Sequence, residues 1–183
     1  MRIESIKISG FKGIPVCADF IPEQGGNPAN VIWREPVFQV NFPKTSPYIS
    51  AIIGPNSCGK SSVLYAMQFF FGPNAKIADE CQYGFKDTTQ PIIIETTFCG
   101  KILNPQGWHQ TNCMSRNGVY FLSLISVFTT DKRYKLIKDA NSQVRKQGAP
   151  DSDNIESLLP KFRLFSADSS LPDAVNPEKK TLA

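Results

Sequence analysis

Alternation of apolar and polar residues predicts several β-strands along the chain. Between residues 2 and 11, Ile6 and Ile8 alternate with polar neighbours, which is typical of a strand with one buried face, and Gly10 is expected to end it. The same pattern predicts strands over residues 16–21, 37–42, 91–98, 119–128 and 133–137. Residues 129–132 are expected to form the hairpin turn between the last two strands.

One segment in the middle of the chain departs from this alternation. Residues 48–53 are almost continuously apolar, and such a run predicts a strand that is buried on both faces. A helical pattern follows over residues 60–71, in which Val63, Met67 and Phe70 fall on one stripe. Gly72 and the proline after it supply a stop signal, so the predicted order is buried strand, short loop and helix.

Three segments show neither strand nor helix periodicity. Residues 22–36 contain Gly25-Gly26-Asn27-Pro28 and predict a surface loop. Residues 141–157 are polar and contain Gly148-Ala149-Pro150, which predicts a loop or an inserted segment. Residues 169–183 are rich in proline and lysine and are expected to be a frayed tail.

The loop between the predicted buried strand and the predicted helix carries the clearest chemical motif. Its sequence, Gly54-Pro55-Asn56-Ser57-Cys58-Gly59-Lys60-Ser61, matches the phosphate-loop pattern G-x-x-x-x-G-K-[ST]. The glycines let backbone N–H groups wrap around phosphate oxygens, and the helix N-terminus directs positive partial charge at them. In such a loop Lys60 contacts the β- and γ-phosphates, Ser61 is a Mg²⁺ ligand and Ser62 adds a further hydroxyl. The alternative is a glycine-rich turn that only caps a helix; the matching elements on both sides favour nucleotide binding.

Composition limits the class of protein. With 183 residues, 41% of them hydrophobic, the chain is long enough for one ordinary domain with its own core. The 5 cysteines form no Cys-x-x-Cys pair, and this odd number favours reduced thiols and a cytoplasmic location. No apolar run is long enough to predict a membrane span, and the N-terminus lacks a signal-peptide pattern. The net charge of +4 is compatible with nucleic-acid contact without arguing for it.

The position of the phosphate loop points to a family. The loop follows an N-terminal strand, the turn Gly10-Phe11-Lys12-Gly13 and two further predicted strands, whereas a small-molecule kinase usually opens with its phosphate-loop strand. In this layout the sequence resembles the ABC-type ATPase heads of the SMC and RecF group, and most closely the OLD-like ATPases that often act in phage defence. The residues that carry the resemblance are Ile6-Lys7-Ile8-Ser9-Gly10-Phe11-Lys12-Gly13-Ile14 and Ala51-Ile52-Ile53-Gly54-Pro55-Asn56-Ser57-Cys58-Gly59-Lys60-Ser61-Ser62-Val63-Leu64.

The resemblance implies a fold and partners. The expected fold is α/β, a P-loop NTPase of ABC-ATPase head type, with a mixed sheet, an N-terminal antiparallel strand portion and a phosphate-loop helix. Residues 1–168 would form a partial ATPase domain with loop insertions at 22–36 and 141–157, and residues 169–183 a frayed tail or the start of a missing C-terminal half. ATP and Mg²⁺ are the implied cofactors. A homodimer or higher oligomer of heads is implied, with DNA and a nuclease or effector protein as candidate partners in anti-phage defence or DNA repair.

The resemblance also assigns residues to the nucleotide. Lys12, after the aromatic residue of the first turn, would reach the phosphates; a solvated turn lysine is an equal alternative. Asn56 is expected near the γ-phosphate, and Ser57 replaces the glycine usual in SMC-type loops, as in OLD-like proteins. Cys58 should have a lowered thiol pKa at the helix N-terminus. The expected nucleotide-binding residues are Lys12, Gly54, Asn56, Ser57, Cys58, Gly59, Lys60, Ser61 and Ser62, with Ser61 as the metal ligand.

The motif that hydrolysis requires is not found in this sequence. ATPases of this class need an apolar strand that ends in Asp and usually Glu. The nearest candidates, Asp131 and Asp168, lack the acidic pair and are expected to be turn residues. The Ser-Gly-Gly signature and a Toprim-type carboxylate cluster are also absent. We therefore expect the N-terminal piece of an ATPase head, with no catalytic residue of its own and with hydrolysis requiring motifs outside this chain. The alternative is a non-hydrolysing nucleotide-binding module of a larger complex.

Three further groups of residues carry weaker signals. The family glutamine that senses Mg²⁺ has as candidates Gln106, Gln110 and Gln143. Metal ligands could come from Cys99, His109 and Cys113, but their spacing matches no zinc pattern and favours core cysteines. DNA phosphates could contact the basic residues Lys132, Arg133, Lys135, Lys138, Arg145 and Lys146, although a solvated hairpin face is favoured.

Overall fold

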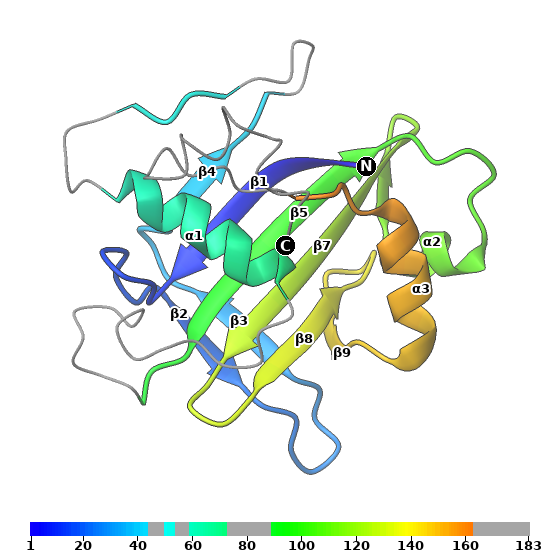
Figure 1. The fold of residues 1–183 in the computed structure, drawn as a ribbon. Helices are drawn as coiled ribbons and strands as arrows, with labels where there is room; N and C mark the ends of the chain where they lie inside the picture. Colours follow the sequence, from blue (N-terminus) through cyan, green and yellow to red (C-terminus); the bar gives the residue numbers. More distant parts are fainter. Residues whose placement is uncertain (44–49, 54–58, 73–88, 163–183) are drawn as a thin grey trace, which may run out of the picture.

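The structure is a computed structural model that describes residues 1–43, 50–53, 59–72 and 89–162 (Figure 1). Its strands are β1 (Arg2–Ser9), β2 (Ala18–Ile21), β3 (Asn30–Trp33), β4 (Gln39–Asn41), β5 (Ile92–Gly100), β6 (Met114–Arg116), β7 (Val119–Phe128), β8 (Arg133–Lys138) and β9 (Val144–Lys146). Its helices are α1 (Lys60–Phe71), α2 (Gly107–Asn112) and α3 (Ala149–Leu158).

Most of the strands form one large sheet. Its order is β4-β1-β5-β7-β8-β9, and the short strand β6 also pairs with β7. Every pairing between the described strands of this sheet is antiparallel. Within the described residues the sheet is therefore not the mixed sheet that we expected. Strands β2 and β3 form a separate antiparallel pair.

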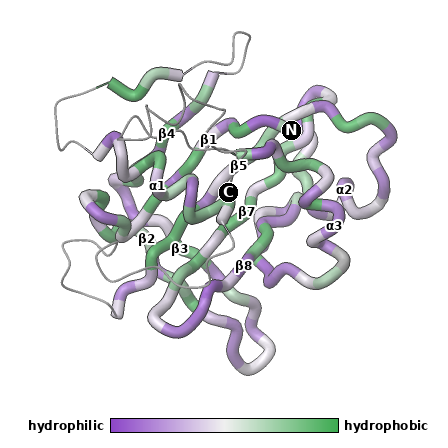
Figure 2. The backbone as a smooth tube through the Cα atoms, viewed as in Figure 1, coloured by the Kyte–Doolittle hydropathy of each residue, from purple (hydrophilic) through white to green (hydrophobic). Residues whose placement is uncertain are grey.

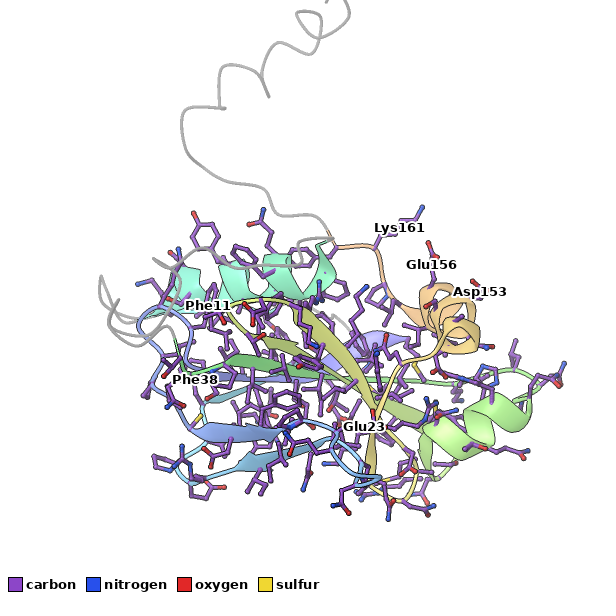
Figure 3. All side chains as sticks on the ribbon, turned by 90° about the horizontal axis from the view of Figure 1, so that it is seen from below. Phe11, Glu23, Phe38, Asp153, Glu156 and Lys161 are labelled. Carbon is purple, nitrogen blue, oxygen red and sulfur yellow. The ribbon has the colours of Figure 1, made fainter. Side chains whose placement is uncertain are left out.

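The large sheet is the middle layer of three. Helix α1 lies on one face, and the β2–β3 pair lies on the other (Figure 3). Successive side chains of a strand point to opposite faces, so Ile92 and Ile94 of β5 pack toward α1 whereas Ile93 packs toward β2–β3. The α1 side of the core includes Ile6, Ile8, Val63, Ala66, Met67, Phe70, Leu122 and Leu124. The other side includes Ala18, Ala29, Ile125, Val127, Leu136 and Val144.

Helix α1 confirms the helix predicted over residues 60–71. Its apolar stripe, Val63, Met67 and Phe70, is buried against the sheet, and apolar residues follow α1 and the central strands in Figure 2. The ring of Phe70 lies 6.2 Å from that of Phe98 on β5, centroid to centroid. The helix ends where the N–H of Gly72 donates to the carbonyl of Gln68 at 2.8 Å.

Apart from the strand predicted over residues 48–53, the predicted strands and the turn are confirmed with small shifts of their ends. Strand β4 is shorter than the predicted segment 37–42, because only Gln39–Asn41 pairs with β1. The predicted hairpin turn joins β7 to β8, with the N–H of Thr129 donating to the carbonyl of Lys132 at 3.0 Å. Helix α2 and strand β6 were not predicted; both are short, and short elements carry too few residues for a periodic pattern.

The loop predictions for residues 22–36 and 141–157 were wrong in part. Strand β3 lies in the first segment and is fixed by pairing with β2, in the register Phe20↔Val31. Strand β9 and helix α3 lie in the second segment. The sequence of α3 is mostly polar, and the helix is held in place both by Ile155, which is buried in the α1 side of the core, and by the polar contacts described below. The tail predicted at residues 169–183 lies outside the described part of the chain.

The buried strand predicted over residues 48–53 is corrected by the structure. Residues 50–53 form no strand and are exposed, and Ile53 is 89% exposed to solvent. Residues 48 and 49 lie outside the described residues. An apolar run becomes a buried strand only beside other strands that bond its backbone groups, and no strand of the described sheet pairs with residues 50–53.

Helix α3 is anchored by the buried carboxylate of Asp151, which is 4% exposed. Arg145 of β9 donates to both of its oxygens at 2.8 Å, and Trp108 of α2 donates to Oδ1 at 2.7 Å. The N–H of Gly148 donates to Oδ2 at 2.7 Å. Hydrogen bonding from Arg145 outweighs the opposing effect of burial and holds the pKa of Asp151 well below its usual range.

We predict that Asp151→Asn lowers the free energy of unfolding by about 2 kcal/mol at neutral pH, because it removes a buried charge-assisted network. The folded pKa is depressed, so this stability is present above the unfolded pKa and is lost as the pH falls. The difference between wild type and variant should therefore shrink below about pH 4. Urea unfolding at neutral and acid pH measures it.

Asp153→Asn is the matched control, because Asp153 lies on the same helix but points outward (Figure 3). It should change stability by less than about 0.5 kcal/mol. An Asp151→Asn deficit that is equally large at both pH values would show that the network does not act through the charge of Asp151.

Candidate nucleotide-binding site

The described part of the phosphate loop is its junction with α1. Gly59 precedes the helix with φ 90° and ψ 6°, in the left-handed region that favours glycine. Lys60 is half-buried in the first turn, Ser61 is exposed and Ser62 is buried. This turn carries no acidic residue. The N-terminus of α1 thus has positive partial charge, a lysine and an exposed hydroxyl, and no carboxylate within that turn opposes an anion.

Four of the predicted loop residues cannot be placed. Gly54, Asn56, Ser57 and Cys58 lie outside the described residues, so their roles, and the lowered thiol pKa of Cys58, stay predictions. The structure places the other predicted residues, Lys12, Gly59, Lys60, Ser61 and Ser62, at or beside the N-terminal half of α1.

The turn after β1 lies against α1, although the two are far apart in sequence. Phe11 is fully buried, and its ring meets that of Phe69 edge-on at 5.8 Å. The ammonium group of Lys12 lies 4.2 Å from the centre of the Tyr65 ring. Such a cation–π contact fixes the lysine beside the second turn of α1. Lys12 is thus not a freely solvated turn lysine, and sequence reasoning missed its partner Tyr65.

Backbone geometry shapes this turn. Gly10 has φ +73°, and a Cβ there would lie 3.2 Å from the carbonyl oxygen of Pro91. Lys12 also has a positive φ, of 53°. The hydroxyl of Ser9 accepts hydrogen bonds from the N–H groups of Cys17 and Ala18, at 2.8 and 3.0 Å. These hydrogen bonds and backbone angles stabilise the turn, and the turn places Lys12 beside α1.

Arg133 of β8 holds the opposite end of α1. Its guanidinium donates to the carbonyls of Phe70 and Gly72, the latter at 2.7 Å, and to the Ser126 hydroxyl at 2.8 Å. Burial lowers the pKa of Arg133 to about 10, so it remains charged at neutral pH. A cation at a helix C-terminus satisfies the last carbonyls and complements the dipole. Sequence reasoning had grouped Arg133 with the surface lysines, because the basic residues adjacent in sequence look alike.

The weaker candidates lie elsewhere. Gln106 and Gln110 belong to the α2 region, across the sheet from the N-terminus of α1, and Gln143 is exposed before β9 (Figure 1). His109 caps α2, since its Nδ1 accepts the N–H of Gln106 at 3.0 Å. Cys99 and Cys113 are buried, and burial raises the pKa of Cys113 to about 11. Among the described residues, no group of three potential ligands could hold a metal ion.

Comparisons with known proteins identify a family. A family model described as AAA ATPase domain matches residues 1–161. Neither the curated proteins nor the solved structures compared with the chain gave a match. In the described part of the chain, no helix has the length and apolar character needed to cross a membrane.

We predict that Gly59→Ala destabilises the protein by about 1–2 kcal/mol, because an L-residue is strained at a positive φ. Gly13→Ala is the matched control: a Cβ there meets nothing within 4 Å, and its φ lies outside the left-handed region. Thermal unfolding of both variants measures the difference. Equal midpoints would show that the conformation of Gly59 is not required.

We predict that Arg133→Leu costs about 2–3 kcal/mol of unfolding free energy, because the carbonyls of Phe70 and Gly72 lose their charged donor. Arg116→Leu makes the same chemical change at an exposed position of β6 and should stay within about 0.5 kcal/mol of wild type. Urea denaturation compares the two. If both variants lose the same stability, Arg133 does not anchor α1.

Proposed function

The chain belongs to the AAA ATPase domain family of P-loop ATPases, and on this premise we propose that it is the ATP-binding part of an OLD-like ABC-type ATPase. The observation that carries the proposal is the contact between the two motifs on which the resemblance depends. The turn after β1 packs against the phosphate-loop helix through Phe11 and Phe69 and through Lys12 and Tyr65. A phosphate loop on an unrelated scaffold would not require this pairing.

The described residues fit Mg-ATP at the N-terminus of α1. Lys60 would hold the terminal phosphates, the exposed Ser61 hydroxyl would be a ligand of Mg²⁺, and the left-handed conformation of Gly59 would let the backbone turn toward the phosphates. Mg²⁺, when bound, would help to neutralise the charge of the phosphates. Ser62 is buried, and we assign it to supporting the first turn as well as to the phosphates. Lys12 lies beside the same helix and would add a further positive charge.

ATP hydrolysis needs a carboxylate that the described sheet does not place near α1. Its two acidic residues, Glu4 and Glu95, line a cavity of about 810 Å³ with Lys7 of β1 and Lys138 of β8. Glu95 belongs to the face opposite α1, where it accepts from Trp33 of β3 at 2.6 Å. Asp131 is exposed in the β7–β8 turn. We therefore propose that hydrolysis depends on an acidic motif outside the described residues.

The cellular role rests on the resemblance. We propose action on or with DNA in anti-phage defence or DNA repair, in the cytoplasm, through a homodimer or higher oligomer of heads and with a nuclease or effector partner. The buried thiols of Cys17 and Cys113 support the cytoplasmic assignment, because reduced cysteines are typical of that compartment.

We predict that Lys60→Ala weakens Mg-ATP binding by about tenfold or more, because the phosphates lose their direct cation. Ser61→Ala should instead reduce the dependence of ATP affinity on Mg²⁺. Lys161→Ala removes an exposed lysine next to Phe162 and is the control with unchanged affinity. Isothermal titration calorimetry of the full chain measures all three. Wild-type protein without ATP affinity, or unchanged affinity in Lys60→Ala, contradicts the proposal.

A second candidate is a nucleotide-binding module that does not hydrolyse ATP. Glu95 lies on the sheet face away from α1, where its carboxylate cannot act at the phosphate loop, and this position favours a module that binds ATP without hydrolysing it when the chain acts alone. A phosphate-release assay separates the two functions: binding without turnover supports the module, whereas steady turnover by the purified chain excludes it.

A further inference from the structure

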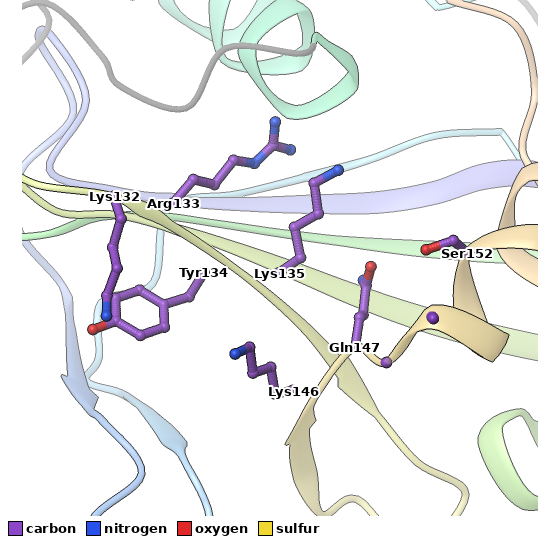
Figure 4. A pocket seen from close by; sticks show the side chains of 9 residues that line it. Lys132, Arg133, Tyr134, Lys135, Lys146, Gln147 and Ser152 are labelled. Carbon is purple, nitrogen blue, oxygen red and sulfur yellow. The ribbon is translucent and has the colours of Figure 1, made fainter.

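A cationic cavity lies between β8, β9 and α3. Its volume is about 430 Å³. Four basic residues line it, Lys132, Arg133, Lys135 and Lys146, together with the polar side chains of Gln147 and Ser152, and no carboxylate is among its lining residues (Figure 4). It lies at the C-terminal end of α1 and so is separate from the proposed nucleotide site, since Arg133 reaches the carbonyl of Gly72.

The fold divides the basic residues of this region into two groups. Arg145 is neutralised by Asp151, and Lys138 lies 3.9 Å from the carboxylate of Glu95. Arg133 is engaged with the end of α1. By contrast, Lys132, Lys135 and Lys146 are exposed and pair with no described carboxylate.

Lys135 lies on the α1 side of β8, whereas Lys132 and Lys146 lie on its other side (Figure 4). Cations that pair with no described carboxylate repel each other around one cavity, and a ligand with several negative charges along its length can reach both sides and reduce this repulsion. We propose that this cavity binds the phosphodiester backbone of nucleic acid, through Lys132, Lys135 and Lys146. The choice of nucleic acid rests on the function proposed above, whereas the anion site follows from the lining residues alone.

The lining residues favour backbone contact over base recognition. The aromatic residue of the cavity is Tyr134, and its ring is already covered: the Phe20 ring lies 4.8 Å away and the Lys132 ammonium 4.7 Å away. No free aromatic platform among the lining residues is left for stacking a base. Lysines that contact only phosphates position the nucleic acid and carry no sequence information. Binding should therefore be steeply salt-dependent and indifferent to base sequence.

An acidic peptide is the competing ligand. Arg133 and Tyr134 of β8 have no described neighbour strand beyond β7, because β9 pairs only from Leu136 onward. A peptide added to a sheet edge draws its specificity from pockets that receive alternate side chains. The lining here is cationic and polar throughout, apart from Tyr134 and Ala149, which favours phosphate.

The test compares oligonucleotide binding by the full chain and by the variant Lys132→Glu/Lys135→Glu/Lys146→Glu, using fluorescence anisotropy with single-stranded DNA of two unrelated sequences. We expect the variant to bind about tenfold more weakly or worse, with a salt-dependence slope lower by about 2. Both sequences should bind alike. The Mg-ATP affinity of the triple variant should not change, so failure of the proposed nucleic-acid site can be distinguished from failure of the proposed nucleotide site.

Lys101→Glu is the control for net charge, because Lys101 is exposed just beyond β5, at the end of the sheet away from the β7–β8 turn. Circular dichroism verifies folding, and Lys135→Ala/Lys146→Ala replaces the triple variant if that one unfolds. If Lys101→Glu and the triple variant lose the same oligonucleotide affinity, the cavity is not the binding site. If poly-glutamate competes as well as DNA of equal charge, nucleic acid is not the specific ligand. If inorganic phosphate competes equally well at the same concentration of phosphate groups, the cavity binds single phosphate ions and not an extended phosphodiester backbone.

Discussion

The burial of one helix against the antiparallel sheet is the interaction on which the rest of this structure depends. Val63, Met67 and Phe70 of α1 lose nearly all their solvent contact against β1, β5 and β7. Each large apolar side chain buried in this way contributes about 1.5–3 kcal/mol. Because α1 also begins with the end of the phosphate loop, the same packing that forms the core fixes the position and direction of the candidate nucleotide site.

The two ends of α1 have different surroundings, and this difference suits the helix to the proposed binding of phosphate at its N-terminus. At the C-terminus, the Arg133 guanidinium satisfies backbone carbonyls and complements the dipole. At the N-terminus, Gly59 has no side chain, and the first turn has no acidic residue. The backbone carbonyls at the C-terminus of α1 are therefore bonded by Arg133, which stabilises the helix. The N-terminus, where the helix dipole is positive, can bind phosphate. Arg133 also lines the cationic cavity, so this one side chain connects the cavity to the C-terminal end of α1.

Several elements could be predicted because their signals are local. Strand β1, strand β7 and helix α1 follow the periodicity of their own residues, and the phosphate loop is a continuous motif. The elements that were missed depend on distant partners. Strand β3 exists through β2, and α3 through the contacts of Asp151 with Arg145 and Trp108. The run of residues 50–53 is the reverse case: its apolar pattern predicts a buried strand, yet no described strand pairs with it.

The sequence by itself determined helix α1, most of the strands and the phosphate-loop motif, because hydrophobic periodicity and a contiguous motif are properties of neighbouring residues. Only the tertiary structure decided which charges remain available. Arg133, Lys135 and Arg145 look equivalent in the sequence, but one caps α1, one faces a cavity and one is paired with Asp151. Likewise, Lys12 acquired its partner Tyr65 only when β1 and α1 met. Charge interactions act through space, so the folding of distant segments assigns their partners.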